Sequence, residues 1–309
     1  MSKKVEKLII LGSGPAGLTA AIYAARGGLD PLIISGERPG GQPTWATEIE
    51  DYPGFPKGVK GPELVSLFKK QAEKFNTRFI NGQAVKVNFH SSPFEINTEG
   101  SKLAARAVVL AVGATPLWLG LPSEQRLIGR GVGVCAVCDG PFFKKKKVAV
   151  VGGGDAAMKE AYFLSKLAES VTIIHRRDTL RAQEVLQKQV KKRPNIKFLY
   201  NSVVKEVLGQ DRVDGLRVQN TQNDKIRTLK IDGAFIAIGH KPDTDFLRGQ
   251  VDLDEKGYIK IFDETRTSVP GVFAAGDAVD HQYRQIVTAA GSGCKAAIDA
   301  VEYLDNIGC

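Results

Sequence analysis

Two cysteines, Cys135 and Cys138, form the motif C-A-V-C inside the stretch GVGVCAVCDGPFF. Such a pair can exchange disulfides, supply half of a zinc site, form a structural disulfide or arise by chance. In disulfide exchange one sulfur attacks as a thiolate and the other resolves the mixed disulfide. Asp139 follows directly. Because an ionised carboxylate is repelled by a thiolate, we expect its carboxyl to have a raised pKa and to hold a proton for donation.

The rest of the sequence weighs against two of these alternatives. A zinc site needs a second pair of ligands at similar spacing, and the other two cysteines, Cys294 and Cys309, are isolated. His175 and His240 lie at predicted strand ends. A structural disulfide that closes so small a loop adds little stability. We therefore expect no metal site and favour a redox pair.

The N-terminal segment contains residues that can position a dinucleotide. KLIILGSGPAGLTAAIYAARGG predicts a strand, the glycines Gly12, Gly14 and Gly17, and an alanine-rich helix. Gly12 allows a tight turn, Gly14 lets the backbone approach a pyrophosphate, and Gly17 lets the helix pack on the strand. The next strand, DPLIISGE, ends at Glu37, 20 residues after Gly17. A carboxylate there accepts hydrogen bonds from a ribose, so this site suits FAD or NAD.

The same pattern recurs 140 residues later. KKVAVVGGGDAAMKEAYFLSKLA predicts a strand, a loop with Gly152 and Gly154, and an amphipathic helix. The following strand, SVTIIHRR, leads into four basic residues: His175, Arg176, Arg177 and Arg181. Guanidinium groups bind a 2′-phosphate through charge-assisted, bidentate hydrogen bonds, so this site suits NADPH. The alternative is that these arginines are a solvated strand end.

Each of the two glycine-loop segments is followed, further along the chain, by a similar apolar strand. ARAVVLAVGATP and IDGAFIAIGHKPDT are both apolar strands that end in glycine and a proline turn, and TSVPGVFAAGDAVD supplies a closing strand to the first unit. We predict an α/β fold with two Rossmann-like, three-layer domains, the second inserted in the first. The FAD-binding domain would comprise residues 1–115 and 246–309, and the NADPH-binding domain, with the CxxC pair, residues 116–245. Two crossings form a double hinge that permits rotation.

The net charge of +9 is concentrated in the middle of the 309-residue chain. Residues 116–245 contain 23 Lys and Arg against 14 Asp and Glu, and the rest of the chain is balanced. These charges form no aromatic-interleaved stripe, so we expect no nucleic-acid partner but an anionic ligand and an acidic protein partner. The run Lys144 to Lys147 is either a solvated turn or part of a docking patch for that partner.

Composition also bears on location. No apolar run approaches the ~18 to 20 residues that span a bilayer, so no membrane association is expected. The N-terminus runs from a short basic start into a strand without a cleavage region for a signal peptide. Four cysteines in a chain of this length do not form a disulfide framework. We therefore expect a cytoplasmic protein.

The chain resembles the low-molecular-weight, FAD-dependent thioredoxin reductases over nearly its whole length. The shared segments are GSGPAGLTAAIYAAR, GGQ, YPGFP, CAVCDG, VGGGDAAMKEA, HRRDTLRA, IGHKPDT, TSVPGVFAAGD and RQIVTAAGSGCKAA. The resemblance implies a homodimer that passes electrons from NADPH to FAD, then to the CxxC disulfide and to thioredoxin. It also implies rotation of one domain against the other between the half-reactions.

The resemblance implies a role for individual residues. Cys138 would be the sulfur near the flavin, Cys135 would attack the partner's disulfide, and Asp139 would protonate the leaving thiolate. FAD would be held by Gly12, Ser13, Gly14, Pro15, Ala16, Gly17, Glu37, Gln42, Asp51, Gly113, Gly276, Asp277, Arg284, Gln285 and Ile286. NADPH would be held by Gly152, Gly154, Asp155, Ala156, His175, Arg176, Arg177 and Arg181.

Some positions depart from the family's pattern. Val137 and Val112 replace threonines, Asp51 stands where an asparagine is usual, and Pro43 and Trp45 alter the loop after GGQ. These changes bear on flavin potential and reoxidation rate rather than on the reaction class. The alternative functions are those of a dithiol oxidase, whose relatives lack the NADPH-binding arginines, and of a non-catalytic redox sensor. The complete set of motifs argues against both.

Overall fold

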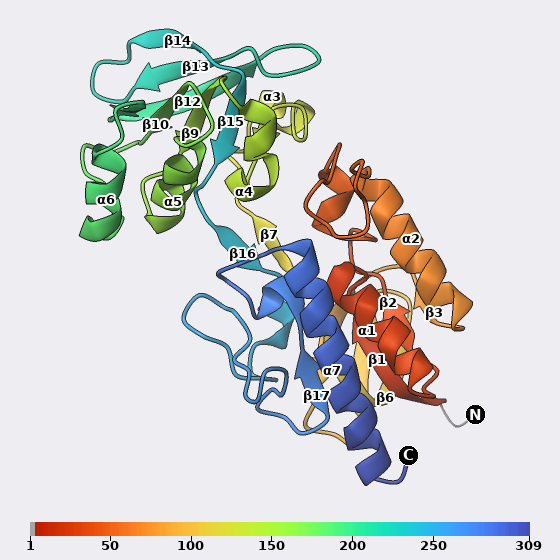
Figure 1. The fold of residues 1–309 in the computed structure, drawn as a ribbon. Helices are drawn as coiled ribbons and strands as arrows, with labels where there is room; N and C mark the ends of the chain where they lie inside the picture. Colours follow the sequence, from red (N-terminus) through yellow and green to blue (C-terminus); the bar gives the residue numbers. More distant parts are fainter. Residues whose placement is uncertain (1–3) are drawn as a thin grey trace. The chain divides into compact units, whose positions relative to one another are not determined.

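A computed structural model describes residues 4–309, which divide into two compact units. The first unit, here the outer unit, comprises the described residues up to Thr115 together with Lys241–Cys309; the second, the inserted unit, is Pro116–His240. Figure 1 shows both in sequence colours. The second boundary lies five residues before the position expected from the sequence. Among the described residues no helix is long and apolar enough to cross a membrane.

The outer unit is built on a seven-stranded sheet in the order β3-β2-β1-β6-β5-β4, with β17 paired to β6. The strands are β1 (Val5–Leu11), β2 (Leu32–Ile34), β3 (Arg78–Ile80), β4 (Ala84–Asn88), β5 (Phe94–Thr98), β6 (Lys102–Leu110) and β17 (Val272–Ala274). The helices are α1 (Pro15–Arg26), α2 (Gly61–Lys74) and α7 (Ile286–Asn306), with short 3-10 turns η1 (Gln42–Trp45), η3 (Asp245–Leu247) and η4 (Gly276–Ala278).

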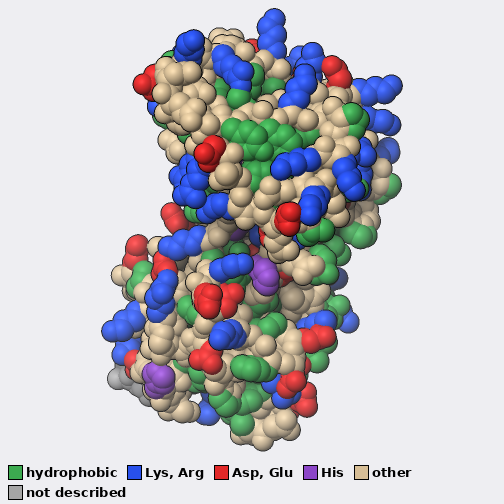
Figure 2. Space-filling model, turned by 90° about the vertical axis from the view of Figure 1, so that its left-hand side faces the viewer, with side chains coloured by type: hydrophobic (Ala, Val, Ile, Leu, Met, Phe, Trp, Pro, Cys, Tyr) green, Lys and Arg blue, Asp and Glu red, His purple; other side chains and the backbone are tan. Residues whose placement is uncertain are grey.

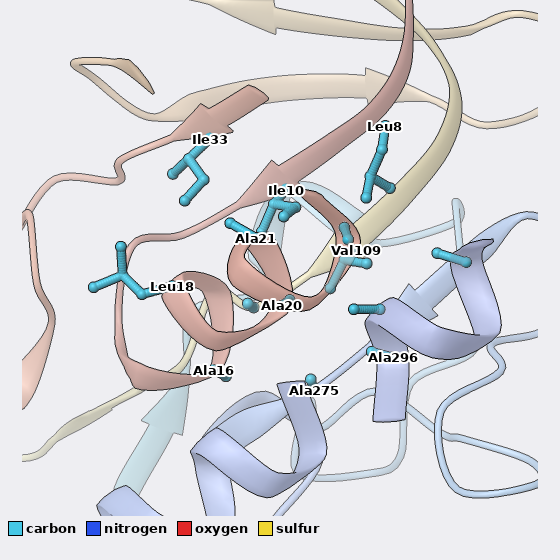
Figure 3. Close-up of a cluster of buried hydrophobic side chains, with 14 of the residues drawn as sticks. Leu8, Ile10, Ala16, Leu18, Ala20, Ala21, Ile33, Val109, Ala275 and Ala296 are labelled. Carbon is cyan, nitrogen blue, oxygen red and sulfur yellow. The ribbon is translucent and has the colours of Figure 1, made fainter. Parts of the chain in front are cut away.

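Both faces of this sheet are buried, as the apolar run of β1 predicts. Leu8 and Ile10 point to one face, where they join a core with α1 and α7 (Figure 3). Ile9 and Leu11 point to the other face, where they pack with the β4–β5 hairpin and the loops before β17. Alternate residues of a strand face opposite sides, so one strand contributes to both cores. The outer unit therefore has three layers.

The inserted unit repeats this plan. Its central sheet is parallel in the order β11-β10-β9-β15-β8, and a second, antiparallel sheet has the order β12-β13-β14. The strands are β8 (Val132–Gly133), β9 (Lys147–Val151), β10 (Ser170–Ile174), β11 (Ile196–Leu199), β12 (Ser202–Leu208), β13 (Gly215–Asn220), β14 (Ile226–Lys230) and β15 (Gly233–Ile236). The helical segments are α3 (Pro122–Arg126), α4 (Ala136–Asp139), η2 (Gly140–Phe143), α5 (Asp155–Leu164) and α6 (Glu184–Lys191).

The inserted unit also buries both faces of its parallel sheet. Val148 and Val150 of β9 pack with α5 and α6, whereas Ala149 and Val151 pack with the β12–β13 layer. Its surface contains the excess of positive charge that the sequence indicates. In the upper part of Figure 2, which this unit forms, Lys and Arg side chains are prominent.

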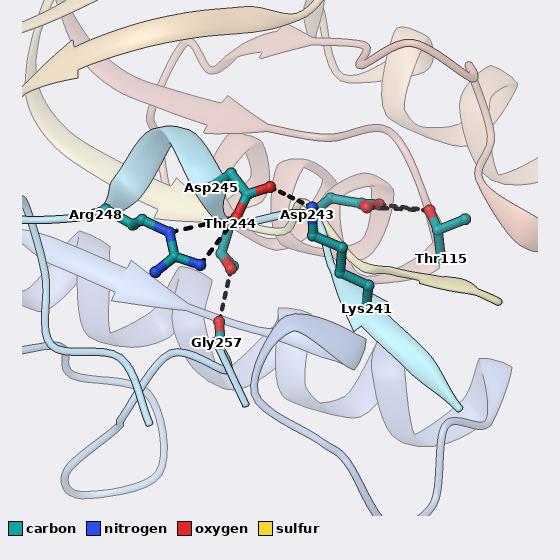
Figure 4. A network of polar contacts seen from close by, with 7 residues as sticks. All are labelled: Thr115, Lys241, Asp243, Thr244, Asp245, Arg248 and Gly257. Atoms are coloured by element: carbon teal, nitrogen blue, oxygen red, sulfur yellow. Dashed lines mark hydrogen bonds and ion pairs between the residues drawn. The ribbon is translucent and has the colours of Figure 1, made fainter. Parts of the chain in front are cut away.

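The chain passes from one unit to the other twice, and these two connections pair as a two-stranded ladder. Its strands are β7 (Ala114–Pro116) and β16 (His240–Pro242). On the inserted side, the Leu117 amide donates to the carbonyl of Gly239 at 2.9 Å. On the outer side, the Thr115 hydroxyl donates to the Asp243 carboxylate at 3.0 Å (Figure 4). Burial raises the pKa of Asp243, and the negative charge of Glu37 adds to this rise.

Candidate functional site

The first glycine loop joins β1 to α1, and two of its glycines are required by close backbone contacts. Gly12 has φ +109°, and a Cβ there would lie 2.2 Å from the Ala111 carbonyl oxygen. A Cβ on Gly17 would lie 2.0 Å from the carbonyl oxygen of Gly12. Gly14, the N-cap of α1, has nothing within 4 Å of the position a Cβ would take. The loop is thus closed against the sheet but open at the helix N-terminus, where a pyrophosphate can approach the amides.

Residues from the far end of the chain complete this region. Gly276 has φ +75°, and a Cβ there would lie 2.9 Å from the Cβ of Ala16. A Cβ on Gly293, in α7, would lie 2.1 Å from the Ala16 carbonyl oxygen. Asp277 follows in η4, and burial raises the pKa of its carboxyl to about 7, with the Asp280 charge adding to the rise. A carboxyl removed from water in this way suits the hydroxyls of a bound ligand.

Several predicted FAD residues use their side chains to hold the protein together. The buried Ser13 hydroxyl donates to the Ser35 carbonyl at 2.7 Å and accepts from the Gly40 amide at 3.0 Å. The Gln42 side-chain amide donates to the carbonyl of Ala114. Ser13 therefore fixes the loop to the end of β2, and only its backbone remains for a pyrophosphate.

The remaining predicted FAD residues lie in loops of the outer unit or at the N-terminus of α7. Glu37 is exposed just past β2, Asp51 is exposed in the loop before α2, and Gly113 has φ +76° just before β7. Arg284 has φ +48°, and its amide donates to Asp280 at 3.2 Å. Gln285 caps α7 in a capping box with Thr288. These positions gather residues from both ends of the chain, as the closing strand predicts.

The second glycine loop joins β9 to α5. Gly152 has φ +155°, and a Cβ there would lie 2.4 Å from the Ala237 carbonyl oxygen. Gly154, the N-cap of α5, again has nothing within 4 Å of a Cβ. Asp155 begins the helix and accepts hydrogen bonds from the Gln183 backbone at 2.7 Å and side chain at 3.0 Å. The helix N-terminus is open here too, while the Asp155 side chain ties α5 to α6.

The basic residues after β10 divide into one buried and three exposed side chains. His175 is 5% exposed, and its Nε2 lies 3.0 Å from the Thr179 carbonyl oxygen. Burial lowers the pKa of His175, and the charge of Arg181 adds to this effect. A Cβ on Gly153 would lie 2.3 Å from the imidazole ring, so the His175 ring packs directly against the glycine loop. The three arginines are exposed: Arg176, Arg177 and Arg181.

Arg181 is held beside the glycine loop by its backbone. Its amide donates to the Gly153 carbonyl at 2.8 Å, and the next amide, of Ala182, donates to the same oxygen at 3.1 Å. No salt bridge among the described residues 4–309 involves Arg176, Arg177 or Arg181. Exposed guanidinium groups at the edge of an open helix N-terminus can bind a phosphate without breaking an ion pair.

The two CxxC cysteines form a disulfide in the inserted unit. The S–S distance is 2.14 Å and the Cα–Cα distance is 5.4 Å. Cys135 is the N-cap of α4, and the Cys138 amide donates to the Cys135 Sγ at 3.1 Å. Both cysteines are partly exposed, and Val137 between them is 53% exposed. The pair can therefore be approached by a macromolecular disulfide.

Two carboxyl groups lie against the segment that contains the disulfide. A Cβ on Gly133, in β8, would lie 2.5 Å from Oδ2 of Asp139. The backbone amide of Ala136 donates to Oε2 of Glu160, in α5. Glu160 is not among the residues predicted from the sequence, because it meets the motif only through the packing of α4 on α5. No group of three or more possible metal ligands occurs within residues 4–309, and we assign no metal site.

A hollow of about 300 Å³ lies elsewhere in the outer unit. It is lined by residues of β4, β16 and η3 and their surroundings: Gln83, Ala84, Val85, Lys241, Pro242, Asp243, Asp245 and Phe246. None of the predicted site residues lines it.

Comparison with known proteins agrees with this geometry. The model of the family "pyridine nucleotide-disulphide oxidoreductase" matches residues 6–293. A thioredoxin reductase of Streptomyces coelicolor is 48% identical, over 97% of this chain and 94% of its own. That of Coxiella burnetii is 46% identical, over 98% of this chain and 97% of its own. The crystal structure of thioredoxin reductase from Streptococcus pyogenes superposes with a TM-score of 0.94, at 40% identity, over 99% of this chain and 100% of its own.

The predicted α/β fold class and the family resemblance are confirmed by these matches. The roles of individual site residues stay predictions. The chain belongs to the pyridine nucleotide-disulphide oxidoreductase family.

Proposed function

We propose that the two glycine loops and the Cys135–Cys138 pair carry out the reaction of a thioredoxin reductase, in which NADPH reduces the disulfide of thioredoxin through FAD. The observation that carries this function is the partly exposed disulfide in the same unit as the glycine loop with its three free-standing arginines. Near-full-length identity to thioredoxin reductases supports it. The enzyme is an NADPH-dependent flavoprotein oxidoreductase.

The outer unit provides a fitting site for FAD. Open space at Gly14 leaves the first amides of α1 accessible to a pyrophosphate, and the exposed Glu37, just past the neighbouring strand β2, accepts the hydrogen bonds of the ribose. The Asp277 carboxyl, with a pKa raised to about 7 by burial, gains a hydroxyl partner when the site is filled. When bound, FAD accepts the reducing equivalents of NADPH and passes two electrons to a disulfide.

The inserted unit binds the electron donor and contains the acceptor. Gly154 leaves the N-terminus of α5 open to the NADPH pyrophosphate, and Arg176, Arg177 and Arg181 bind its 2′-phosphate. These arginines discriminate against NADH, which lacks the phosphate.

The dithiol completes the reaction by disulfide exchange. Two electrons and two protons convert the Cys135–Cys138 disulfide to two thiols. Cys135 then loses its proton, and its thiolate attacks the partner's disulfide, forming a mixed disulfide and releasing one partner sulfur as a thiolate. Cys138 loses its proton in turn and breaks the mixed disulfide, which re-forms the internal disulfide and releases the second partner sulfur. Asp139 protonates the leaving thiolate. Each turnover therefore returns the pair to the oxidised state described above.

Three further features belong to this proposal. Rotation of the units about the β7 and β16 connections presents the nicotinamide and the disulfide alternately to the flavin. The enzyme acts as a homodimer, and it works in the cytoplasm, where thioredoxin is kept reduced. Sedimentation velocity of the FAD-loaded protein tests the dimer: a single species at the monomer mass contradicts it.

Anaerobic titration with NADPH tests the function directly. We expect bleaching of the flavin absorbance by NADPH, and NADPH oxidation that depends on added thioredoxin. The Cys135→Ser variant should still bleach with NADPH but should not reduce thioredoxin. A wild-type protein whose bound flavin is not bleached by NADPH would overturn the proposal.

A further inference from the structure

Glu160 is a half-buried carboxylate of α5 that reaches the segment containing the disulfide. Its Oε2 accepts the hydrogen bond of the Ala136 amide, the first amide after Cys135. Ala136 itself is fully buried, and it contributes to the same core as Ala161 and Met158 of α5. The carboxylate is therefore hydrogen-bonded to the peptide group that joins Cys135 to Ala136.

The packing of the segment fixes this contact. Gly140 directly follows α4, and a Cβ there would lie 3.1 Å from Phe163 and 3.3 Å from Leu164 of α5. The backbone after the disulfide thus lies closely against the side chains of α5. Val137, between the cysteines, points to solvent instead. Glu160 thus contacts the buried Ala136, whereas Val137 next to it is exposed.

A carboxylate in this position disfavours the thiolate. A thiolate is stabilised by nearby amide donors and positive charge, and the potential of a CxxC pair becomes more oxidising as its reduced form is stabilised. Here the Ala136 amide is occupied by Glu160, and the carboxylate adds like-charge repulsion. The Cys138 amide donates to the Cys135 sulfur, and the other carboxyl of the segment, that of Asp139, lies against Gly133.

We propose that Glu160 is a positioning residue that keeps the Cys135–Cys138 pair strongly reducing, by holding the Ala136 amide and placing a negative charge beside Cys135. The inference deepens the proposed function, on which it rests. When the disulfide gains two electrons and two protons, Glu160 favours the protonated thiol at Cys135 over the thiolate. The reduced pair is then less stable relative to the disulfide and passes its electrons more readily to another disulfide.

Substitution of Glu160→Gln in the FAD-loaded enzyme tests this idea. Glutamine has the same shape, and its amide oxygen can still accept from Ala136, so the charge alone is removed. We expect about a tenfold change in the equilibrium of the Cys135–Cys138 pair with a glutathione buffer, or about 30 mV toward a less negative potential. Alkylation of the quenched thiols with a mass tag measures the oxidised fraction. This measurement requires neither NADPH nor thioredoxin, so its failure is distinct from failure of the proposed reaction.

A second measurement isolates Cys135. In a Cys138→Ser background, the pH dependence of iodoacetamide alkylation reports the pKa of the Cys135 thiol. We expect Glu160→Gln to lower that pKa by about one unit, because a tenfold change in equilibrium corresponds to one pKa unit. Cys294 and Cys309, the two free cysteines, are replaced by serine in all variants of this series.

Glu169→Gln is the matched control. Glu169 lies in the same unit, and its carboxylate forms an exposed ion pair with Lys147 at 3.7 Å, so the variant removes an equal charge away from the disulfide. It should leave the potential and the Cys135 pKa unchanged. Lower thermal stability of Glu160→Gln with an unchanged potential and an unchanged thiol pKa would show a purely structural role and overturn the inference. Glu160→Asp, which keeps the charge, should remain close to wild type in both measurements.

Discussion

The two glycine loops of this chain have the same backbone plan but different surroundings. In both, one glycine with positive φ abuts a neighbouring strand end and another leaves the helix N-terminus open. The loop of the outer unit is packed against α7, through Ala16 and Gly293, and Glu37 follows the adjoining strand β2. The loop of the inserted unit is supported by His175 and bordered by exposed arginines. The fold fixes where a pyrophosphate binds, and the strand end selects which dinucleotide it belongs to.

The largest expected effects come from the glycines that abut a strand. Gly12→Ala places a methyl 2.2 Å from the Ala111 oxygen, and Gly152→Ala places one 2.4 Å from the Ala237 oxygen, both at positive φ. Each should cost at least ~3 kcal/mol of stability in its own unit. Gly12→Ala should lose FAD, whereas Gly152→Ala should keep FAD and lose NADPH binding. Flavin absorbance after gel filtration and NADPH titration distinguish them.

Gly154→Ala is the control for this pair, because nothing lies within 4 Å of its Cβ. It should fold with wild-type thermal stability. Equal loss of FAD from Gly12→Ala and Gly152→Ala would contradict the separation of the two sites.

The arginines should come next. Arg176→Ala, Arg177→Ala and Arg181→Ala each remove a charge-assisted contact of about 1.5–3 kcal/mol. The KM for NADPH should rise about 10- to 100-fold, while activity with NADH stays the same. Steady-state kinetics with the two nucleotides measure the ratio. A parallel loss with NADH would indicate that the arginines support the fold rather than the 2′-phosphate.

The two units should respond to pH in opposite directions. Burial raises the pKa of Asp277 from 3.8 to about 7, so the folded outer unit binds this proton more tightly than the unfolded chain does. Without FAD, its stability should therefore fall as the pH rises from about 4 to about 7. Asp277→Asn should remove this dependence, and Glu255→Gln, an exposed acid of the same unit, should not. Hydrogen exchange over residues 272–290 of the FAD-free protein provides the measurement.

The smallest expected effect concerns His175. Burial lowers the pKa of His175 from 6.5, so the unfolded chain binds this proton more tightly than the folded inserted unit does. Its contribution to stability is present above pH 6.5 and is lost as the pH falls through the lowered folded pKa. The hydrogen-exchange protection factors over residues 150–182, which are corrected for the intrinsic pH dependence of exchange, should fall on acidification in wild type but not in His175→Gln. The exposed His90, replaced in the same way, provides the comparison; equal behaviour of both variants would refute the assignment.

Much of this architecture follows from local sequence. The glycine spacing and the apolar strands indicate both units, because a strand, a tight turn and a helix depend on residues close in the chain. Contacts between distant residues could not be predicted in this way. Examples are Ser13 with Ser35, Asp155 with Gln183, and His175 with Gly153. Glycine spacing identifies where a cofactor approaches, but not which nearby side chains form contacts within the protein instead of binding the cofactor.

Glu160 illustrates the same limit at the redox pair. It lies 24 residues after Ala136, and only the packing of α4 on α5 brings the two together. A polar residue on a helix face whose neighbours Met158 and Ala161 are buried is a signal that could have drawn attention to it.

The adjacency of Leu117 and Gly239 has a consequence for how this chain folds. A disordered stretch of the length of residues 116–240 would oppose closure of the outer sheet through its loop entropy. Once folded, the inserted unit has its two ends side by side, with the Leu117 amide 2.9 Å from the Gly239 carbonyl oxygen, and to the rest of the chain it behaves as a short turn. Independent folding of the insert would therefore lower the entropic barrier to pairing β6 with β17, whose residues lie on either side of it in sequence.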